Sequence, residues 1–370
     1  MNLLYASRVI HCRVQFSLPR EHRLNQTPQY VLSGLRPTGR VHLGNYFGAV
    51  RNWVELQERH PCFFFVADWH ALTSDYADPS KIRDATFNAV ADWIAAGLDP
   101  KRCTIFVQSA VKQHAELHLL LSMTTPLPWL ERVPTFKDQQ QQLQEKDLNT
   151  YGFLGYPLLQ TADIIIYRAA FVPVGEDQAS HLELSREIVR RFNNFYGDVF
   201  PEPQPLLTPT PIVPGLDGQK MSKSYNNTIP LTASADEVRA LVMTMFTDPN
   251  RIRRKDPGNP DICNLFQFHK LFSDQPTVER VDRECRTAMI GCVDDKKLLA
   301  EIMIEKLRPI RARREEIDRD PSIVWDTLRE GNRVARQRTE ETMELVRKAM
   351  KIDYPELREG SAPKIDGYFA

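Results

Sequence analysis

Residues 30–48 read YVLSGLRPTGRVHLGNYFG, and this stretch predicts a buried strand, a loop and the start of a helix. The strand covers residues 30–32 and is expected to end at the Ser-Gly pair that follows. Pro37 and Gly39 mark the loop, and an amphipathic helix is expected over about residues 43–58. A strand that leads through a loop into a helix is the repeating unit of α/β folds.

The same alternation continues along the chain. Further strands are predicted over residues 62–67, 104–107 and 171–174, and further helices after residues 78–80 and over about 178–195. The strand segments are apolar throughout, which indicates a parallel sheet with helices on both faces. We therefore expect an α/β fold, with a Rossmann-like parallel-sheet catalytic domain whose ligands bind at the carboxyl ends of the strands.

The second half of the chain has a different character. Residues 198–219 are rich in proline and are interpreted as a linker, and from about Ala235 the chain is helical and rich in Arg and Glu. A C-terminal α-helical domain is expected there. The predicted divisions are a poorly structured extension over 1–29, the catalytic domain with its Lys220–Ser224 loop over 30–232, the helical domain over 233–350 and a tail over 351–370.

The composition excludes several classes of protein. Of the 370 residues 42% are hydrophobic, which suffices for real cores, and the formal net charge is zero, which excludes a polyanion binder that relies on overall charge. No stretch approaches the ~20 apolar residues of a membrane helix, so no membrane partner is expected. The six cysteines are sparse and indicate reduced thiols in a cytosol-like compartment.

The N-terminal extension leaves two interpretations open. Residues 1–29 hold four arginines and a single acidic residue, Glu21, as an Arg-rich and acid-poor transit peptide does. They are otherwise a disordered or misassigned start. The expected location is the cytoplasm, or the mitochondrial matrix if this segment is a transit peptide.

Residues 220–224 read Lys-Met-Ser-Lys-Ser and follow a glycine- and proline-containing turn over 214–218. Lys220 and Lys223 supply two positive charges, and the serines supply hydroxyl donors. Displacement at phosphorus builds charge on oxygen atoms, which positioned cations stabilise. The pentapeptide is therefore interpreted as a phosphate-handling loop, and the alternative is a solvated surface turn.

A second candidate phosphate site is the start of the helix at residues 41–45. His42 lies where a donor can reach phosphate oxygens and where the helix dipole favours negative charge. Asn45 adds another polar group, and Gly44 leaves bare backbone against which a flat ring such as adenine could rest. The alternative is a glycine that serves helix packing beside an exposed histidine.

A polar stripe marks the apolar helix that Pro157 opens. Tyr156, Gln160 and Asp163 fall on one face, whereas the other faces carry leucine, isoleucine and alanine. Polar groups on so apolar a helix must pair internally or face a polar ligand. Asp163 is thus either a ligand-binding carboxylate or a paired structural acid.

Two strand ends carry further candidates. Gly175-Glu176-Asp177-Gln178 joins a strand to a helix, where Gly175 permits close approach and Asp177 can accept from ribose hydroxyls or cap the helix. His70 follows another strand, and it is either a site residue or a satisfied core histidine.

Together these segments resemble the class I aminoacyl-tRNA synthetases, and among them the tryptophanyl-tRNA synthetases of bacterial or organellar type. Residues 220–224 match the KMSKS signature letter for letter, and residues 42–45 stand at the HIGH signature. Residues 156–163 and 172–178 resemble the family's tryptophan and ribose segments. The resemblance covers about residues 30–350.

The resemblance implies activation of L-tryptophan with ATP and Mg²⁺, transfer to tRNA-Trp, and a homodimer. It assigns Asp163 to the indole N–H and Tyr156 and Gln178 to the ammonium side, with Gln160 and His70 near the amino acid. His42, Lys220 and Lys223 would act on the phosphates. The implied ATP-binding residues are Arg36, Pro37, Thr38, Gly44, Asn45, Gly175, Glu176, Asp177, Ile212, Lys220, Met221, Ser222, Lys223 and Ser224. Phenylalanine, which lacks the N–H, would leave a buried carboxylate unpaired.

The sequence departs from the family at several positions. Arg36 stands where Gln is common and Leu32 where Phe is common, so the roles of those residues do not carry over. Cys263, Cys285 and Cys292 have the spacing of an iron–sulfur site of some relatives, but the fourth position is Asp295, a poorer ligand. We expect a degenerate site without a metal.

Three rival functions remain open from the sequence. They are a tyrosine-specific synthetase, a small-molecule nucleotidyltransferase and a catalytically silent tRNA-binding paralogue. The helical residues after Lys220 argue against the second rival, and the two intact signatures argue against the third. Basic runs within residues 251–255 and 296–314 are either solvated helix faces or part of a tRNA surface.

Overall fold

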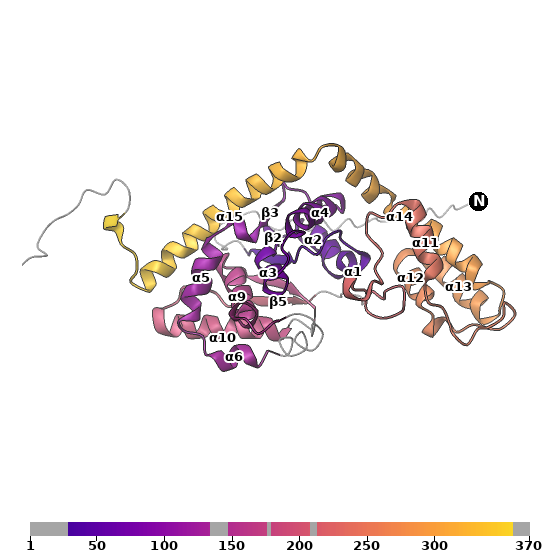
Figure 1. Ribbon diagram of the computed structural model, residues 1–370, viewed down its shortest axis with the longest axis horizontal. Helices are drawn as coiled ribbons and strands as arrows, with labels where there is room; N and C mark the ends of the chain where they lie inside the picture. The colour runs from indigo at the N-terminus through magenta and orange to yellow at the C-terminus, as the bar shows by residue number, and fades with distance from the viewer. Residues whose placement is uncertain (1–28, 134–146, 176–178, 208–212, 358–370) are drawn as a thin grey trace, which may run out of the picture.

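The computed structural model describes residues 29–133, 147–175, 179–207 and 213–357. Its described part holds a five-stranded parallel sheet in the order β3-β2-β1-β4-β5 (Figure 1). The strands are β1 Val31–Leu35, β2 Cys62–Val66, β3 Cys103–Val107, β4 Phe171–Val174 and β5 Gln204–Leu207. The predicted α/β class with a parallel sheet is confirmed.

Two strands differ from the prediction. β1 continues through Gly34 to Leu35, because its whole length pairs with β2, from Val31 opposite Cys62 to Leu35 opposite Val66. β5 lies in the segment that was interpreted as a linker. A proline cannot donate to a sheet ladder, so Pro205 is tolerated there because β5 is an edge strand.

The chain order reverses between β1 and β4. From β1 the chain moves outward through β2 to β3, and it returns to β4 on the other side of β1. The carboxyl ends of strands next to such a reversal form a crevice in which α/β proteins bind ligands. The helices before this return are α1 Leu43–Asn45, α2 Arg51–Leu56, α3 Asp68–Asp75, α4 Ile82–Ala95, α5 Gln113–Ser122, α6 Leu127–Glu131, α8 Tyr151–Leu154 and α9 Tyr156–Ile166.

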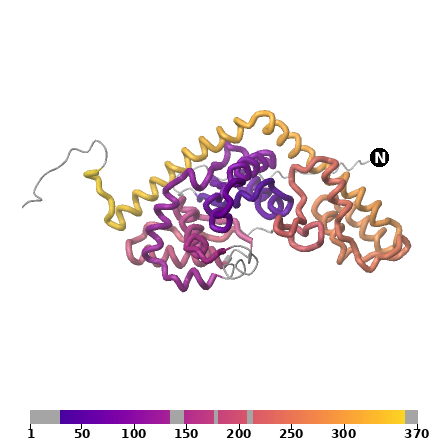
Figure 2. The backbone as a smooth tube through the Cα atoms, viewed as in Figure 1, coloured from indigo at the N-terminus to yellow at the C-terminus, as the bar shows by residue number. Residues whose placement is uncertain are grey.

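After β4 come α10 Ala179–Tyr196, α11 Ala235–Thr244, α12 Asn264–Phe272, α13 Gln275–Arg286, α14 Cys292–Arg319 and α15 Ser322–Ala349. Helices α11 to α13 form a region at one end of the molecule, and α15 runs back along the part that holds the sheet (Figures 1 and 2). None of the helices in the described part of the chain is long and apolar enough to cross a membrane.

Helix α15 packs on the sheet rather than on the helical region. Asn332 Oδ1 accepts a hydrogen bond from the backbone N–H of Val107 at 2.9 Å. A Cβ on Gly331 would lie 1.8 Å from the carbonyl oxygen of Ile105. Only glycine therefore allows the helix to approach β3 this closely.

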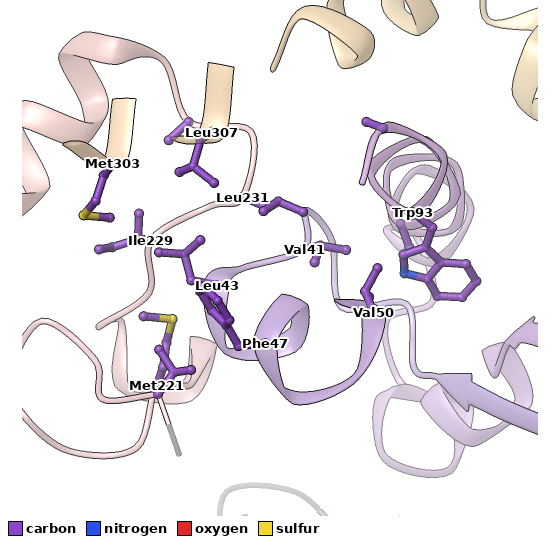
Figure 3. Close-up of a cluster of buried hydrophobic side chains, with 14 of the residues drawn as sticks. Val41, Leu43, Phe47, Val50, Trp93, Met221, Ile229, Leu231, Met303 and Leu307 are labelled. Carbon is purple, nitrogen blue, oxygen red and sulfur yellow. The ribbon is translucent and has the colours of Figure 1, made fainter. Parts of the chain in front are cut away.

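One apolar cluster connects the sheet region to α14. Val41, Leu43, Phe47 and Val50 from the start of the sheet domain pack with Met221, Ile229 and Leu231 and with Met303 and Leu307 of α14 (Figure 3). The hydrophobic core is therefore continuous across the boundary that was predicted near residue 233.

A buried carboxylate reinforces this junction. Asp92 on α4 accepts hydrogen bonds from the backbone N–H of Val41 at 2.7 Å and from Thr232 Oγ1 at 3.3 Å, and it forms an ion pair with Arg314 of α14. Arg314 Nη2 also donates to Asn88 Oδ1 at 2.7 Å. Burial raises the pKa of Asp92, and the neighbouring Arg314 guanidinium opposes that increase.

Replacing Arg314 by Leu should destabilise the fold strongly, because Asp92 would remain buried without its arginine partner. Loss of one member of a buried ion pair costs about 3–5 kcal/mol. The free energy of unfolding, measured in urea, should fall by that amount. Arg313→Leu is the matched control, since Arg313 pairs with Glu316 at the surface and such pairs contribute about 1 kcal/mol or less. Equal losses in the two variants would contradict this account of the junction.

Candidate active site

The ends of four strands and the segment over residues 213–231 surround one region of the molecule. Arg36 follows β1, Asp68 and His70 follow β2, Gln108 follows β3 and Gly175 follows β4. The backbone N–H of Leu43 donates to the carbonyl of Ile229 at 2.9 Å, which brings the later segment beside the first helix. The two candidate phosphate loops, about 180 residues apart in sequence, are therefore neighbours.

His42 is the N-cap of the helix that begins at Leu43, as predicted for the start of this helix. Its Nδ1 accepts a hydrogen bond from the backbone N–H of Asn45 at 3.3 Å, and Asn45 Oδ1 accepts from the His42 backbone N–H at 3.5 Å. Because Nδ1 acts as an acceptor, the ring proton belongs on Nε2. Burial, together with the nearby Lys223 ammonium, lowers the pKa of His42 to about 4, so the ring is a neutral N–H donor at pH 7.

The Lys220–Ser224 loop is attached through its methionine. Met221 is buried, and its sulfur accepts a contact from the backbone N–H of Gly44 at 3.2 Å. A Cβ on Gly44 would lie 2.9 Å from the His42 ring and 3.3 Å from Met221 Cβ. In this structure the bare backbone of Gly44 is thus covered by Met221 and His42.

Lys223 reaches across to the loop after β1. Its Nζ donates to the carbonyl oxygen of Thr38 at 2.6 Å and lies 3.4 Å from Thr38 Oγ1. Burial lowers the pKa of Lys223 to about 8, with Arg40 acting in the same direction and Asp92 opposing it. Lys220 and Ser224 are exposed, and Ser222 is partly buried.

Asn227 organises this loop, although the sequence analysis did not single it out. The side chain is buried, its Oδ1 accepts from the backbone N–H of Ser222 at 2.8 Å, and its Nδ2 donates to Asp217 Oδ1 at 2.8 Å and to the Lys220 carbonyl at 3.2 Å. A Cβ on Gly215 would lie 2.1 Å from Asn227 Nδ2, so this contact requires glycine. No local sequence signal identifies Asn227, because its partners depend on the folded loop.

Arg36 lies in the loop after β1 and contacts the end of α3. Its Nη2 donates to Ser74 Oγ at 2.5 Å and lies 3.5 Å from Asp75 Oδ2. Its Nε is buried and has no hydrogen-bond partner among the described residues. Burial lowers the pKa of Arg36 despite the nearby Asp75 carboxylate. The guanidinium therefore retains an unused donor.

Asp163 is the centre of a buried polar network. Its side chain is 1% exposed. His70 Nε2 lies 2.8 Å from Oδ2, His114 Nδ1 lies 2.6 Å from Oδ1, and Gln108 Nε2 lies 2.8 and 2.9 Å from the two oxygens. Of the two alternatives for Asp163, internal pairing is therefore present, and it does not exclude a ligand on the side of His70.

The network keeps Asp163 ionised. Burial alone would raise the pKa of this carboxyl, but the hydrogen bonds from His114 and His70 outweigh burial, and the pKa lies below its ordinary value. The carboxylate is not a lone acceptor, however. A ligand without an N–H would not leave it unpaired, because His70, Gln108 and His114 already donate to it.

Three members of this network were not identified from the sequence: Gln108, His114 and Tyr167, whose hydroxyl lies 2.9 Å from His114 Nε2. Gln108 directly follows β3. Ligands bind at the carboxyl ends of parallel strands, and this rule, which located His70, could also have located Gln108. His114 on α5 and the residue after α9, Tyr167, carry no such signal.

The other predicted amino-acid-site residues lie on or near α9. Tyr156 is buried, with its ring centroid 5.9 Å from that of His181 and 5.6 Å from that of Phe153. Gln160, on the same helix as Asp163, is partly buried. Glu176, Asp177, Gln178 and Ile212 lie outside the described residues, and Gly175 is the last described residue before the first three.

Two of the three cysteines of the helical region, Cys285 and Cys292, lie beside an arginine. Arg251 Nη1 lies 3.8 Å from both Cys285 Sγ and Cys292 Sγ, and Asp295 lies 3.1 Å from His269 Nε2. Burial raises the pKa of Cys285 to about 11. Within the described ranges no group of three His, Cys, Asp or Glu side chains could hold a metal ion.

Comparison with known proteins places these features in a family. The family model described as tRNA synthetases class I (W and Y) matches residues 24–308. The chain is 52% identical to the tryptophan–tRNA ligase of Thermotoga maritima over 324 residues, which cover 87% of this chain and 99% of that protein. It is 45% identical to the tryptophan–tRNA ligase of Ralstonia nicotianae over 397 aligned residues, with 88% and 99% covered.

A solved structure agrees with these relatives. The tryptophanyl-tRNA synthetase of Campylobacter jejuni, complexed with ADP and tryptophan, superposes with a TM-score of 0.80 at 33% sequence identity. The match covers 87% of this chain and 99% of that one.

Replacing Asn227 by Ala should loosen the Lys220–Ser224 loop, because three hydrogen bonds to the loop and its preceding turn would be lost. Each such bond contributes about 0.5–1.5 kcal/mol, so the rate of trypsin cleavage after Lys220 and Lys223 should rise at least about tenfold. Ser224→Ala, which changes an exposed hydroxyl in the same loop, is the control and should leave the rate unchanged. An unaltered cleavage rate in Asn227→Ala would show that the loop is held by other contacts.

Proposed function

This chain belongs to the class I tRNA synthetases of the W and Y family, and on that premise we propose that it is a tryptophan–tRNA ligase. It activates L-tryptophan with ATP to tryptophanyl-adenylate and transfers the amino acid to tRNA-Trp. The observation that carries this proposal is the 52% identity to a tryptophan–tRNA ligase over almost the whole of that protein.

The reaction needs no protein nucleophile. A carboxylate oxygen of tryptophan attacks the α-phosphorus of ATP, and the bond to the β-phosphate oxygen breaks to release pyrophosphate. A hydroxyl of the terminal ribose of tRNA then attacks the activated carbonyl carbon, and AMP leaves. The protein therefore contributes positioning and charge stabilisation.

The phosphate side of the site is assigned as follows. His42 donates from Nε2 to a phosphate oxygen, which its neutral state and its acceptor Nδ1 support. Lys220 and Lys223 stabilise the charge that develops on the phosphates. Lys223 would exchange the Thr38 carbonyl for a phosphate oxygen, and the free Nε of Arg36 supports a further anionic contact.

The remaining nucleotide contacts come from two groups of residues. The adenosine moiety would be held at Asn45 and at the strand end at Gly175, with Asp177 on the ribose. It would reach the Gly44 backbone only after Met221 moves away from it. The other proposed contact residues are Pro37, Thr38, Glu176, Ile212, Met221, Ser222 and Ser224. Because Met221 and Gly44 are packed together, Met221 contributes chiefly by holding the loop against the first helix.

The amino-acid side of the site centres on Asp163. Its carboxylate accepts the indole N–H, with Tyr156 and Gln178 on the ammonium side and Gln160 and His70 adjacent. The ionised state of Asp163 supports this role. Selection against phenylalanine then depends on two factors. One is the shape of the pocket, and the other is the ability of the indole N–H to replace one of the protein donors to Asp163.

Magnesium would enter with the nucleotide. Mg²⁺ is commonly held by substrate phosphates and water rather than by an all-protein cage, and the described residues provide no cage of three ligating side chains. The ion would neutralise phosphate charge beside Lys220 and Lys223.

A homodimer is proposed through the face of α5, α6 and α10. Leu119, Met123, Leu127 and Phe195 are exposed on these helices. Arg191 joins them, because its guanidinium lies 5.7 Å from the centroid of Trp129 and 5.1 Å from that of Phe195. An exposed apolar patch of this kind is typical of a protein interface.

The helical region after residue 233 would bind tRNA-Trp. The proposed location of the protein is the cytoplasm.

The function is tested by ATP–pyrophosphate exchange with each of the twenty amino acids, followed by charging of a tRNA-Trp transcript. Tryptophan should exceed phenylalanine and tyrosine by at least about 10³-fold in kcat/KM. A preference for tyrosine would contradict the assigned specificity. Binding of tRNA without any exchange would contradict the proposed enzyme activity.

The ammonium of Lys223 gives the reaction a pH dependence. A lysine whose pKa is about 8 is charged below that pH and neutral above it, so kcat/KM for ATP at saturating tryptophan should fall above pH 8. At saturating tryptophan this parameter reports groups of the enzyme–tryptophan complex that ATP meets. Lys223→Arg should remove the decline up to about pH 10, because arginine stays protonated.

Lys223→Ala provides the complementary measurement. It should slow adenylate formation far more than it weakens tryptophan binding, since the ammonium acts on the phosphates. Equal losses in the two quantities, or a decline above pH 8 that persists in Lys223→Arg, would count against the role of Lys223.

A further inference from the structure

The three side chains that donate to Asp163 differ in how firmly they are held. Gln108 and His114 are fully buried, whereas the His70 side chain is 12% exposed. Gln108 is held at both ends of its amide, because its Oε1 also accepts from the Trp69 backbone N–H at 3.1 Å. His70 is therefore the donor that lies toward solvent.

His114 is held by a second buried hydrogen bond. Asp163 can only accept, so His114 Nδ1 carries the proton of that contact. His114 Nε2 then accepts from the Tyr167 hydroxyl at 2.9 Å. Both ring nitrogen atoms of His114 therefore have a partner: Asp163 fixes the proton on Nδ1, and the Tyr167 hydroxyl occupies Nε2.

Aromatic rings fix the Tyr167–His114 pair in place. The centroid of the Tyr167 ring lies 4.8 Å from that of Phe63 and 5.4 Å from that of Phe106. The centroid of the His114 ring lies 6.0 Å from that of Phe106. Both side chains are fully buried. Rotation of the imidazole would break two hydrogen bonds and disturb this packing.

We propose that His114 and Tyr167 are positioning residues for tryptophan recognition: they hold Asp163 Oδ1, so that Oδ2, which His70 shares, faces the indole N–H. This inference rests on the proposed function and adds two residues to it. Neither residue touches the substrate. They act through the orientation of the Asp163 carboxylate, which Gln108 constrains from the end of β3.

The probe that separates this role from a structural one is β-(benzothiophen-3-yl)alanine, in which sulfur replaces the indole N–H. The measured quantity is the ratio of kcat/KM for tryptophan to kcat/KM for the analogue in ATP–pyrophosphate exchange. A misdirected Asp163 lowers only the tryptophan value. A general loss of folded enzyme lowers both values and leaves the ratio unchanged.

Three variants test the pair in graded steps. His114→Leu removes the donor to Asp163 and should lower the ratio roughly 10- to 100-fold, as expected for a hydrogen bond to a charged group. His114→Asn retains a donor near the Nδ1 position and should recover most of the wild-type ratio. Tyr167→Phe keeps the ring packing but frees the imidazole, and it should lower the ratio roughly 3- to 10-fold.

Tyr196→Phe is the control, because the partly buried Tyr196 ring packs against the same apolar cluster, with its centroid 4.8 Å from that of Phe192. Its ratio should equal that of the wild type. An unchanged ratio in Tyr167→Phe would overturn the proposal, even if His114→Leu fails to fold. A wild-type enzyme that charges tRNA-Trp but does not distinguish the analogue would instead refute the role of Asp163 while leaving the proposed function intact.

Discussion

The arrangement of the candidate site depends on the burial of one methionine. Met221 packs in the cluster that Leu43 and Ile229 also join (Figure 3). Its sulfur contacts the Gly44 backbone. An apolar residue between four polar ones turns the pentapeptide into an anchored loop, since its single apolar side chain is removed from water and its cations remain near the surface. Without this anchor, Lys223 would not be held beside the loop that follows β1.

Two buried aspartates illustrate how partners decide the state of an acid. Asp92 and Asp163 are both almost completely buried, and burial alone raises the pKa of a carboxyl. For Asp92 burial prevails over the Arg314 ion pair, and the pKa is raised. For Asp163 the donors from His114 and His70 prevail, and the pKa is lowered. The first carboxylate joins α4 to α14, whereas the second presents a stable negative charge to a candidate ligand.

The proposed site divides into two parts with different surroundings. The residues proposed to act on the phosphates, His42 and Lys223, lie in or beside the loops around residues 36–45 and 220–224, where Lys223 now donates to the Thr38 carbonyl. The residues proposed for amino-acid recognition include the fully buried His114 on α5 and Asp163 on α9, which lie beside aromatic rings. A selective pocket benefits from rigidity, whereas a loop that stabilises a transient charge must adapt.

The sequence by itself determined the alternation of strands and helices, the parallel sheet, the helix start at His42 and the polar stripe that includes Asp163. These features follow from local periodicity and from residue chemistry within a few turns. Only the tertiary structure decided that β5 forms in the proline-rich segment, that α15 returns to the sheet, and that Asn227, Gln108, His114 and Tyr167 complete the two halves of the site. The physical reason is that a hydrogen bond between His114 and Asp163, 49 residues apart, is decided by how α5 packs on α9. Sequence could state that Asp163 must have a partner, but only the packing of the helices selected which side chains provide it.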